Sequence, residues 1–462
     1  MWTSFRAVTA EVCIVGAGLA GLSAAAHLQK NGIAFTLLEA SNRLGGRVYP
    51  TEYQNSTIQL GAEFINGKDN EMYRIASRLK LISGKEDDYS IYENNPLVAT
   101  GSAQFDPELM TAWSEFVDPL ENEFYEQSNE HLAMTIGELF RSKYDVWIKD
   151  HAENKTVFDE LAKTYVNYYE SEWSADINKL ALANFHHWDD GSEDESSFTM
   201  RGKGFGGVLK EIVKRVDQKK IRLNSEVSKI EWQTSPIRVS LSTNQVVECQ
   251  TVILTVPLGV LKANSISILP ELPQAKKRVI NDLGFGRLEK LFLVYDKIWW
   301  DKDASHYITL NFGEEYKSFV SSIRGFESMD EQPKMLKVWI SGSGPEQLSN
   351  LSENEIKKEI TFFLRTQMND SSIPEPTTIV IHKWLADKYT KGAYSYITPE
   401  AYTHFKDPYG EMMKPVKHQN KSVICFAGEH THRTLYQTTS GAYESGLREA
   451  NRVVNEFKEK KG

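Results

Sequence analysis

Cysteine is scarce in this sequence of 462 residues: Cys13, Cys249 and Cys425 are the three present, and none belongs to a CxxC pair. Paired cysteines are the usual mark of a zinc site or a dithiol redox centre, so this spacing argues against both. Each cysteine lies in an apolar, strand-like run, which is typical of a buried structural thiol. We therefore expect no metal centre.

Long apolar runs and an excess of positive charge are also missing. No stretch approaches the roughly 20 apolar residues of a membrane-spanning helix, and the first residues lack the apolar core of a signal peptide. The last residues form neither a peroxisomal tripeptide nor a prenylation box. The net charge of −10 argues against nonspecific DNA binding and is compatible with a cationic ligand. We expect a cytoplasmic protein without membrane or nucleic-acid partners.

The rest of the composition is that of an ordinary globular protein, with 40% hydrophobic and 25% charged residues. Single hydrophobic cores stop growing at roughly 250–300 residues. A chain of 462 residues therefore predicts about two to three domain-sized units.

A nucleotide-binding pattern begins at Val12–Val15, a run of apolar residues that predicts a buried parallel strand. The next six residues, Gly16-Ala17-Gly18-Leu19-Ala20-Gly21, have the G-x-G-x-x-G spacing, and Leu22–Gln29 predicts a helix. A second strand, Ala34–Leu38, ends at Glu39, eighteen residues after Gly21. Strand, glycines, helix, strand and acid in this order predict a dinucleotide site, whereas the glycines alone would not.

Each part of this pattern has a physical role. Gly16 permits a tight turn, Gly18 lets the backbone approach a pyrophosphate, and Gly21 lets helix and strand pack closely. Leu19 and Ala20 complete the glycine-rich turn, and the N-terminus of the helix that follows offers free N–H groups to phosphates. Glu39 is placed to bind ribose hydroxyls.

The residues after Glu39 indicate which dinucleotide binds. Ala40, Arg43, Gly45, Gly46 and Arg47 belong to E-A-S-N-R-L-G-G-R, which resembles the extended FAD fingerprint of flavin amine oxidases and their glutathione-reductase-like relatives. The resemblance implies noncovalent FAD, with arginines at the pyrophosphate and glycines that let the chain turn beneath it. In isolation, the same residues would indicate a surface turn with solvated arginines.

The segment Ile58–Gly67 resembles the D-x-G-A-x-W-I-H-G segment of polyamine oxidases, whose backbone passes along the flavin. The resemblance implies that the four residues from 61 to 64 contact the cofactor, namely Gly61, Ala62, Glu63 and Phe64. Asn66 stands where relatives have histidine or glutamate. Its amide can hydrogen-bond or orient an amine, but it cannot titrate.

Residues 70–184 are rich in charged and aromatic residues and predict helices. Within Tyr165–Trp173, Glu170 and Glu172 resemble the acids near the amine tunnel of polyamine oxidases, and Glu172 aligns best. Solvated carboxylates on a helix face are an equally good interpretation. The acidic stretch Asp189–Ser197 is interpreted as a solvated connector, with an electrostatic funnel for polycations as the alternative.

Lys290 begins an apolar strand in Leu283–Tyr295, where an ammonium is costly unless it has a function or reaches solvent. The segment resembles the G-F-G-x-x-x-K of polyamine oxidases, which implies that Lys290 holds a water beside the flavin N5. In the same family a valine matching Val227 contacts the adenine through its backbone. Trp384, Tyr389 and Tyr394 match W-x-x-x-x-Y-x-x-G-A-Y-S, which implies flavin contacts and, for Tyr394, a wall of the amine cage.

The C-terminal segment Val423–Arg448 resembles animal spermine and acetylpolyamine oxidases over G-E-H-T-H-R-x-x-Y-x-T-T-x-G-A. The resemblance implies that Gly428, Glu429, Thr438 and Thr439 contact the flavin and that Thr438 shapes the reacting end. Ser440 stands where many relatives have histidine, and we expect it on the substrate side.

Together these features predict an α/β protein of two domains. A Rossmann-like, glutathione-reductase-like FAD-binding domain comprises residues 1–75, 198–265 and 399–462, and an α+β substrate domain comprises 76–197 and 266–398. The expected activity is that of a polyamine oxidase: hydride passes from a neutral amine to flavin N5, and O₂ reoxidises the flavin to give H₂O₂. We expect a monomer or weak homodimer.

Three alternatives remain open. The first is a histone-lysine demethylase, although no chromatin-binding module or long coiled-coil insertion is evident. The second is an L-amino-acid oxidase, which needs an arginine for the substrate carboxylate that the sequence does not locate. The third is an FAD-binding protein without turnover, which Asn66 and Ser440 keep open.

Overall fold

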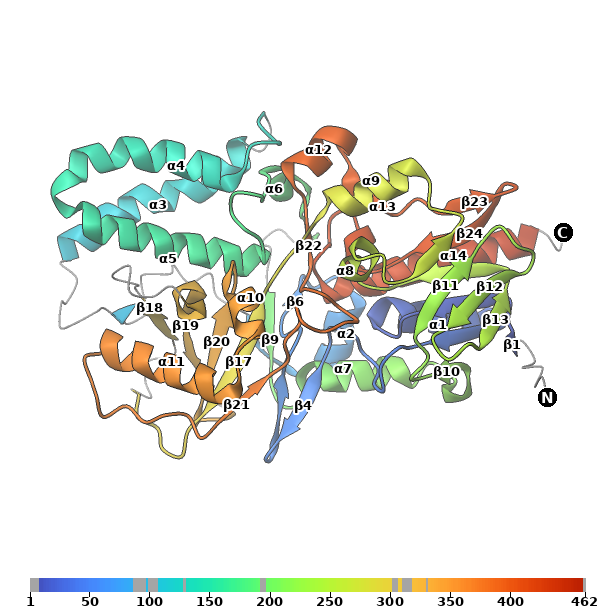
Figure 1. The fold of residues 1–462 in the computed structure, drawn as a ribbon, viewed down its shortest axis with the longest axis horizontal. Coiled ribbons are helices and arrows are strands. Elements are labelled where there is room, and N and C mark those ends of the chain that lie inside the picture. Colours follow the sequence, from blue (N-terminus) through green and yellow to red (C-terminus); the bar gives the residue numbers. More distant parts are fainter. Residues whose placement is uncertain are drawn as a thin grey trace.

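The computed structural model describes residues 8–85, 97–98, 107–127, 130–191, 197–300, 306–309, 318–329 and 331–459. The chain forms an elongated molecule of two halves (Figure 1). The half on the right of the view holds a parallel sheet and both termini, and the half on the left holds a second sheet and a group of long helices.

The first half is built on a six-stranded sheet whose first five strands are parallel. In spatial order they are β10 (Ile221–Arg222), β3 (Phe35–Leu38), β2 (Val12–Val15), β14 (Thr251–Leu254), β24 (Lys421–Phe426) and the antiparallel β23 (Val416–His418). Strands β2, β3 and β14 are buried along their whole length, as their mostly apolar sequences predict. The sheet draws strands from all three segments predicted to form the FAD-binding domain.

Layers cover both faces of this sheet because successive side chains of a strand point to opposite sides. Ile14 and Ile253 pack among α1 (Leu19–Lys30), α7 (Gly204–Val213) and α14 (Thr439–Glu459). Cys13 and Val252 pack on the other side against a five-stranded sheet. Its strands, in order, are β1 (Val8–Thr9), β13 (Val246–Cys249), β12 (Ile237–Leu241), β11 (Val227–Glu231) and β15 (Ser267–Leu269). All three cysteines are buried free thiols, as expected.

The segment after residue 265 stays with the first half for longer than the predicted domain limits imply. Strand β15 pairs with β11, and α9 (Gln274–Asp282) packs on α8, α12 and α13. These helices span Leu258–Lys262, Pro399–Phe405 and Pro408–Met412. The chain reaches the second half through β16 (Gly284–Phe285), which pairs with β22 (Ser395–Tyr396).

The second half contains a mainly antiparallel sheet of six strands, in which β8 and β18 pair in parallel. In order they are β21 (Thr378–Ile381), β17 (Glu289–Val294), β20 (Met335–Ile340), β19 (Ile323–Ser328), β18 (His306–Thr309) and β8 (Leu97–Val98). Leu291 and Leu293 pack in the core that also holds residues of α10 (Gly344–Ser349) and α11 (Glu353–Gln367). The alternation of β17 therefore turns Lys290 and Phe292 to the opposite face, toward the first half.

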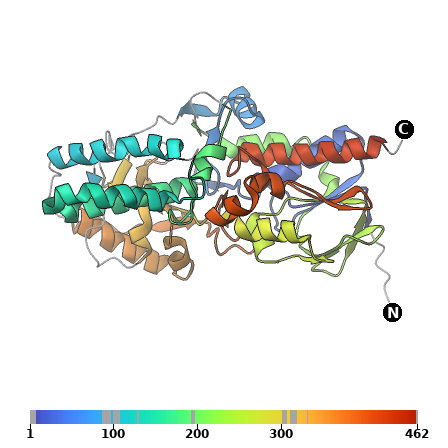
Figure 2. The ribbon, with the colours of Figure 1, turned by 90° about the horizontal axis from the view of Figure 1, so that it is seen from above.

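A group of helices lies at the end of the molecule remote from the termini (Figure 2). They are α3 (Pro107–Gln127), α4 (Ile136–Trp147), the 3₁₀ turn η1 (Ile148–Asn154), α5 (Lys155–Trp173) and the short α6 (Ala183–His187). Their shared core is aromatic, with Trp113, Phe140 and Phe158 buried at its centre. The expectation of helices over residues 70–184 holds for most of the described part of that range, and the strands Ile82–Lys85 and Leu97–Val98 are exceptions.

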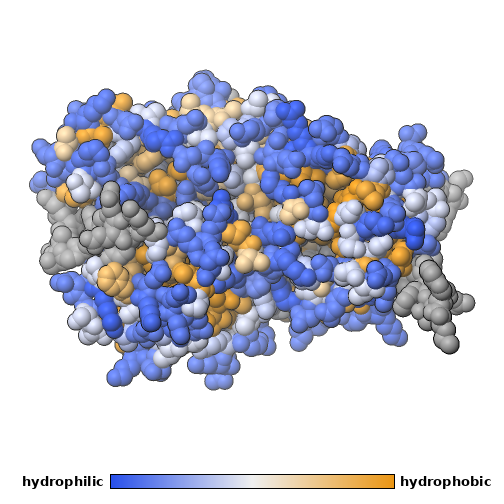
Figure 3. Space-filling model, in the orientation of Figure 1, coloured by the Kyte–Doolittle hydropathy of each residue, from blue (hydrophilic) through white to orange (hydrophobic). Residues whose placement is uncertain are grey.

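The remaining elements are short. They are β4 (Pro50–Tyr53), β5 (Ser56–Gln59), β6 (Ile65–Asn66), α2 (Glu71–Arg78), β7 (Ile82–Lys85) and β9 (Ser197–Met200), with 3₁₀ turns at Gln218–Lys220, Phe319–Ser322 and Glu429–Thr431. Residues 192–196 of the predicted acidic connector lie outside the described residues. The face in Figure 3 is mostly hydrophilic, with smaller hydrophobic areas between. None of the helices in the described part of the chain has the length and apolar character needed to cross a bilayer.

Candidate functional site

A cavity of about 720 Å³ extends from the parallel sheet of the first half into the second half. Its wall contains every residue predicted to contact the cofactor except Gly21, and it also contains Lys290, Tyr394, Asn66 and Glu172. Segments that are far apart in the sequence therefore meet around one space.

The glycine loop connects β2 to α1. Strand β3 lies on one side of β2 and β14 on the other, so the sheet extends from β2 to both sides. This is the switch point of the sheet, where open α/β folds bind ligands. Gly16 has a φ of +105°, and a Cβ on Gly21 would stand 1.9 Å from the Gly16 carbonyl oxygen. Gly21 thus supports the close turn from behind instead of lining the cavity. Gly18 is the N-cap of α1 and supplies no side-chain cap, so the first-turn N–H groups face the loop.

Glu39 is fixed at the end of β3 by hydrogen bonds to both of its carboxylate oxygens. The Ala17 amide donates to Oε2 at 2.7 Å, and the Ser41 amide and hydroxyl donate to Oε1 at 2.9 and 2.7 Å. A carboxylate has about four lone-pair positions, so these bonds orient it and leave acceptor capacity toward the cavity. Val227 lines the same region from β11.

The two arginines of the fingerprint have different surroundings. The Arg43 guanidinium lies 3.7 Å from the centre of the Tyr49 ring. Arg47 donates to the Ala393 carbonyl at 2.6 Å and to Glu429 Oε1 at 2.9 Å. Both arginines line the cavity, so neither is the fully solvated residue of a surface turn.

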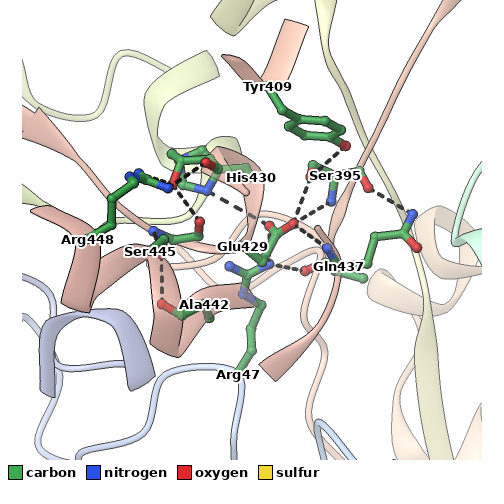
Figure 4. A network of polar contacts seen from close by, with 12 residues as sticks. Arg47, Ser395, Tyr409, Glu429, His430, Gln437, Ala442, Ser445 and Arg448 are labelled. Carbon is green, nitrogen blue, oxygen red and sulfur yellow. Dashed lines mark hydrogen bonds and ion pairs between the residues drawn. The ribbon is translucent and has the colours of Figure 1, made fainter. Parts of the chain in front are cut away.

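Glu429 joins three segments of the chain (Figure 4). Its Oε1 accepts from Arg47, while Oε2 accepts from the Ser395 hydroxyl at 2.7 Å and the Gln437 amide at 3.0 Å. Burial opposes ionisation, but Arg47 and these donors hold the pKa of Glu429 below its usual value. The neighbouring His430 is buried, which lowers its pKa to about 4, so it is neutral at pH 7.

Hydrogen bonds fix the chain between Glu429 and α14. The Gly428 amide donates to Ser445 Oγ at 2.8 Å, and Arg448 donates to the Thr431 carbonyl at 2.9 Å (Figure 4). Thr438 Oγ1 accepts from the Gly441 amide at 2.9 Å, so it caps the helix that begins at Thr439. The Thr439 hydroxyl oxygen is buried without a hydrogen-bond partner, and Thr439 lines the cavity.

Lys290 reaches the cavity because it lies on the face of β17 that points to the first half. Its Nζ donates to the Gly61 carbonyl at 2.8 Å and to Glu63 Oε2 at 2.7 Å. The adjacent Glu289 instead accepts from the Trp384 and Leu385 amides at 2.9 and 3.0 Å. Burial raises the pKa of Glu289 to about 7.

Aromatic residues line the cavity around Lys290. Trp384 donates from its indole to the Leu60 carbonyl at 3.0 Å, and Tyr389 donates to Glu226 Oε2 at 3.4 Å. Tyr394 donates to the Glu172 carbonyl at 3.0 Å, which fixes its ring in the wall, and burial raises its pKa. Further rings in the wall, not singled out from the sequence, are Tyr125, Tyr168, Tyr169, Trp173, Phe185, Trp188 and Trp339.

Of the four residues predicted to hold the substrate, two line the cavity and two do not. Asn66 lies in the wall and donates from Nδ2 to Ser197 Oγ at 3.0 Å. Glu172 also lies in the wall, and its Oε1 accepts from Arg324 at 2.6 Å. Arg324 also lies with its guanidinium 4.7 Å from the centre of the Tyr168 ring.

Glu170 and Ser440 are outside the cavity wall. Glu170 lies on α5 two positions before the wall residue Glu172. Glu170 accepts from the Ile177 amide at 3.2 Å instead, and burial raises its pKa to about 7. Ser440 is buried in the first turn of α14, one position beyond the wall residue Thr439.

Comparison with known proteins agrees with this geometry. Residues 19–454 match the family described as Flavin containing amine oxidoreductase. The chain belongs to this family. The predicted resemblance to flavin amine oxidases and the α/β fold with a glutathione-reductase-like half are thereby confirmed.

Several relatives within this family match nearly the whole chain. The human peroxisomal N(1)-acetyl-spermine/spermidine oxidase is 27% identical, over 96% of this chain and 95% of the relative. Human lysine-specific histone demethylase 2 is 26% identical over 96% of this chain. The chain spans about half of that demethylase, 53% of its length. A solved putrescine oxidase with bound putrescine shares the fold, with a TM-score of 0.71 and 17% identity over 97% of this chain and all of that one.

Proposed function

We propose that the cavity binds FAD noncovalently. The N-terminus of α1 and the arginines Arg43 and Arg47 suit a pyrophosphate, and Glu39 suits a ribose. Val227 would contact the adenine, and the stretch from Gly61 to Phe64 would lie along the flavin ring. The orphaned Thr439 hydroxyl supports this proposal because a buried polar atom facing a cavity calls for a partner.

Noncovalent binding is supported by the composition of the wall. A covalent flavin link commonly uses cysteine or histidine, and neither residue occurs in the described lining of the cavity. Denaturing the purified protein should release free yellow flavin into the supernatant. A flavin spectrum that stays with the precipitated chain would contradict noncovalent binding.

We infer further that the protein is an amine oxidase of the polyamine type. The observation that carries this proposal is the continuity of the cavity from the cofactor residues, past Lys290, to an end lined by aromatic rings and carboxylates. Glu63, Glu121, Glu172 and Glu327 supply carboxylates to this part of the wall. Aromatic faces and carboxylates both favour a cationic amine.

Bound FAD would supply the redox chemistry, taking hydride from the carbon next to the amine nitrogen and passing electrons to O₂. The protein residues position and shield the reaction. Lys290 would hold a water near the reacting centre, and Tyr394 presents a fixed ring that excludes other water. Thr438 is committed to capping α14, and so directs the positive end of that helix toward the cavity.

Two alternatives have specific support. The similarity to histone demethylases favours methylated lysine as a second substrate class, although the chain spans about half of those proteins. Arg324 is an arginine in the cavity wall that the sequence did not locate, and an L-amino-acid oxidase needs such a group for the substrate carboxylate. Its ion pair with Glu172 favours a different role, because the guanidinium already has a carboxylate partner.

The test is a peroxide assay with the purified holoenzyme and a panel of amines. The panel comprises spermine, spermidine, their N-acetyl forms, putrescine, a dimethyl-lysine peptide and L-amino acids. Peroxide from polyamines alone is the expected result. Turnover of the peptide alone, or of the amino acids alone, would contradict the polyamine assignment and support the corresponding alternative. The cytoplasmic location and the monomeric or weakly dimeric state stay sequence-based predictions.

A further inference from the structure

Four charged side chains form a buried cluster beside the cavity: Glu63, Lys290, Lys337 and Glu327. Lys290 Nζ lies 2.7 Å from Glu63 Oε2, and Lys337 Nζ lies 2.8 Å from Glu63 Oε1. Lys337 also lies 2.6 Å from Glu327 Oε2. The two lysine side chains are only 2% and 8% exposed, so both ammonium groups depend on these carboxylates for stabilisation.

The sheet of the second half builds this cluster from three neighbouring strands. Lys290 pairs across β17 and β20 with Trp339, and Phe292 pairs with Lys337. Lys337 pairs across β20 and β19 with Glu327. The two lysines are therefore diagonal neighbours on one face, near enough for their side chains to interact.

Like charges at such positions repel each other, and Glu63 compensates for this by bridging them with separate oxygens. The indole of Trp339 lies beneath both, 4.7 Å from Lys290 Nζ and 5.4 Å from Lys337 Nζ. Two carboxylates and two ammonium groups leave the cluster neutral. Its members are unequal, because Lys337 has two carboxylate partners and Lys290 has one.

This inequality makes Lys290 the most easily titrated member. Burial and the neighbouring Lys337 lower the pKa of Lys290, and Glu63 opposes them. The pKa of Lys337 is raised, because Glu327 and Glu63 together outweigh burial. Despite its burial, Glu63 has its pKa lowered to about 2 by the two lysines, so it stays ionised.

Other charged groups near the cluster are engaged elsewhere. Glu289 accepts two backbone amides on the opposite face of β17. Glu172 is paired with Arg324, which reaches the cavity from β19. The charge state of Lys290 is therefore governed mainly by Glu63, Lys337 and Glu327.

We propose that Lys337 and Glu327 are positioning residues that act on Lys290 through Glu63. Lys337 holds one oxygen of Glu63 so that the other stays on Lys290, and Glu327 balances the charge that Lys337 brings. The Lys290 ammonium is thereby held in place, with two N–H groups committed, to Gly61 and Glu63, and a third for the cavity. The inference rests on the proposed function in that it takes the flavin ring to lie beside Lys290.

The test is a pH titration of the visible absorption of oxidised flavin in the holoenzyme, without substrate. Loss of the Lys290 charge should give one spectral transition at alkaline pH, which Lys290→Met removes. Glu63→Gln should move this transition down by at least about one pH unit, because the ammonium loses its ion pair. Lys337→Met should move it up, because a repelling charge is removed, and Lys337→Arg should keep it near the wild-type pH.

Opposite shifts in Glu63→Gln and Lys337→Met support the proposal, since a purely structural role would not give them opposite signs. Lys357→Met is the matched control. Lys357 is a lysine of α11, 9% exposed, that pairs with Glu353 and lies outside the cavity wall. This variant should titrate as wild type.

Three results would overturn the proposal: no wild-type transition, unshifted transitions in both variants, or shifts of the same sign. If Lys337→Met does not fold, the separate variants Glu63→Gln and Lys337→Arg are compared instead. A Glu63→Gln variant whose transition stays at the wild-type pH then overturns the proposal. Failure of the proposed function is distinguishable, because a wild-type protein that oxidises no amine would still titrate.

Discussion

Arg47 and Glu429 are 382 residues apart in the chain, and Arg47 Nη1 lies 2.9 Å from Glu429 Oε1 in the wall of the cavity. The pair joins the glycine-rich N-terminal unit to the last strand of the parallel sheet. Glu429 is 4% exposed at its side chain, so this carboxylate depends on Arg47 for its charge. The ion pair therefore links two distant segments of the cavity wall.

Arg47→Ala should destabilise the protein and weaken FAD binding, because it leaves Glu429 buried and unpaired. Breaking one side of a buried pair costs about 3–5 kcal/mol, and the partial exposure of Arg47 favours the lower end. Thermal unfolding with and without added FAD measures both effects. Arg74→Ala removes an exposed pair with Glu71 and should cost under about 1 kcal/mol. Equal changes in the two variants would contradict the role of Arg47.

Lys290→Met should fold and bind FAD, but slow flavin reduction or reoxidation by roughly 10²-fold, the lower range for a positioned proton-transfer group. The reason is that Lys290 is the one lysine in the described cavity wall close to Gly61 and Glu63. Stopped-flow absorbance measures the two half-reactions separately. If both match those of wild type, Lys290 has a structural role.

Asn66→His should add a titrating group to the wall of the cavity. The wild-type residue is an amide that donates to Ser197, so the pH profile should show no enzyme limb from this position. The variant should show a limb near the free histidine value of about 6.5. Its KM for long polyamines should change more than kcat, because a remote contact contributes mostly uniform binding. An unchanged profile and KM would mean that Asn66 does not contact the substrate.

Arg324→Gln should lower the KM for polyamines, and Glu172→Gln should raise it. Removing the guanidinium leaves Glu172 unneutralised in the wall, where it can pair with a distal ammonium of the substrate. Both side chains are partly exposed, so each change should be worth under about 1 kcal/mol, or up to about fivefold in KM. Steady-state kinetics at several ionic strengths measures this. Shifts of the same sign in the two variants would contradict the assignment.

The local parts of the site could be predicted from the sequence. The unit from Val12 to Glu39 is contiguous, and the order of its elements reports its geometry directly. The role of Lys290 was predicted mainly from the resemblance of its segment to polyamine oxidases, supported by the cost of an ammonium within an apolar strand. Both predictions depend on residues that lie close together in the chain.

The partners of these residues could not be predicted in the same way. Lys337 and Glu327 meet Lys290 only through the register of β17, β20 and β19, which a single sequence does not specify. Arg324 lies on strand β19 and Glu172 on helix α5, two elements that are distant in the sequence. The sequence could not separate Glu172, which lies in the wall, from Glu170, which does not, because α5 has aromatic residues on more than one face.

The most direct test of the central claim is anaerobic reduction of the bound flavin by spermine or spermidine in a stopped-flow spectrophotometer. The proposal predicts complete bleaching of the oxidised flavin band, at a rate that rises with pH as the substrate amine loses its proton. Admission of O₂ should then restore the band with formation of H₂O₂. A flavin that stays oxidised with every polyamine would contradict the proposed function.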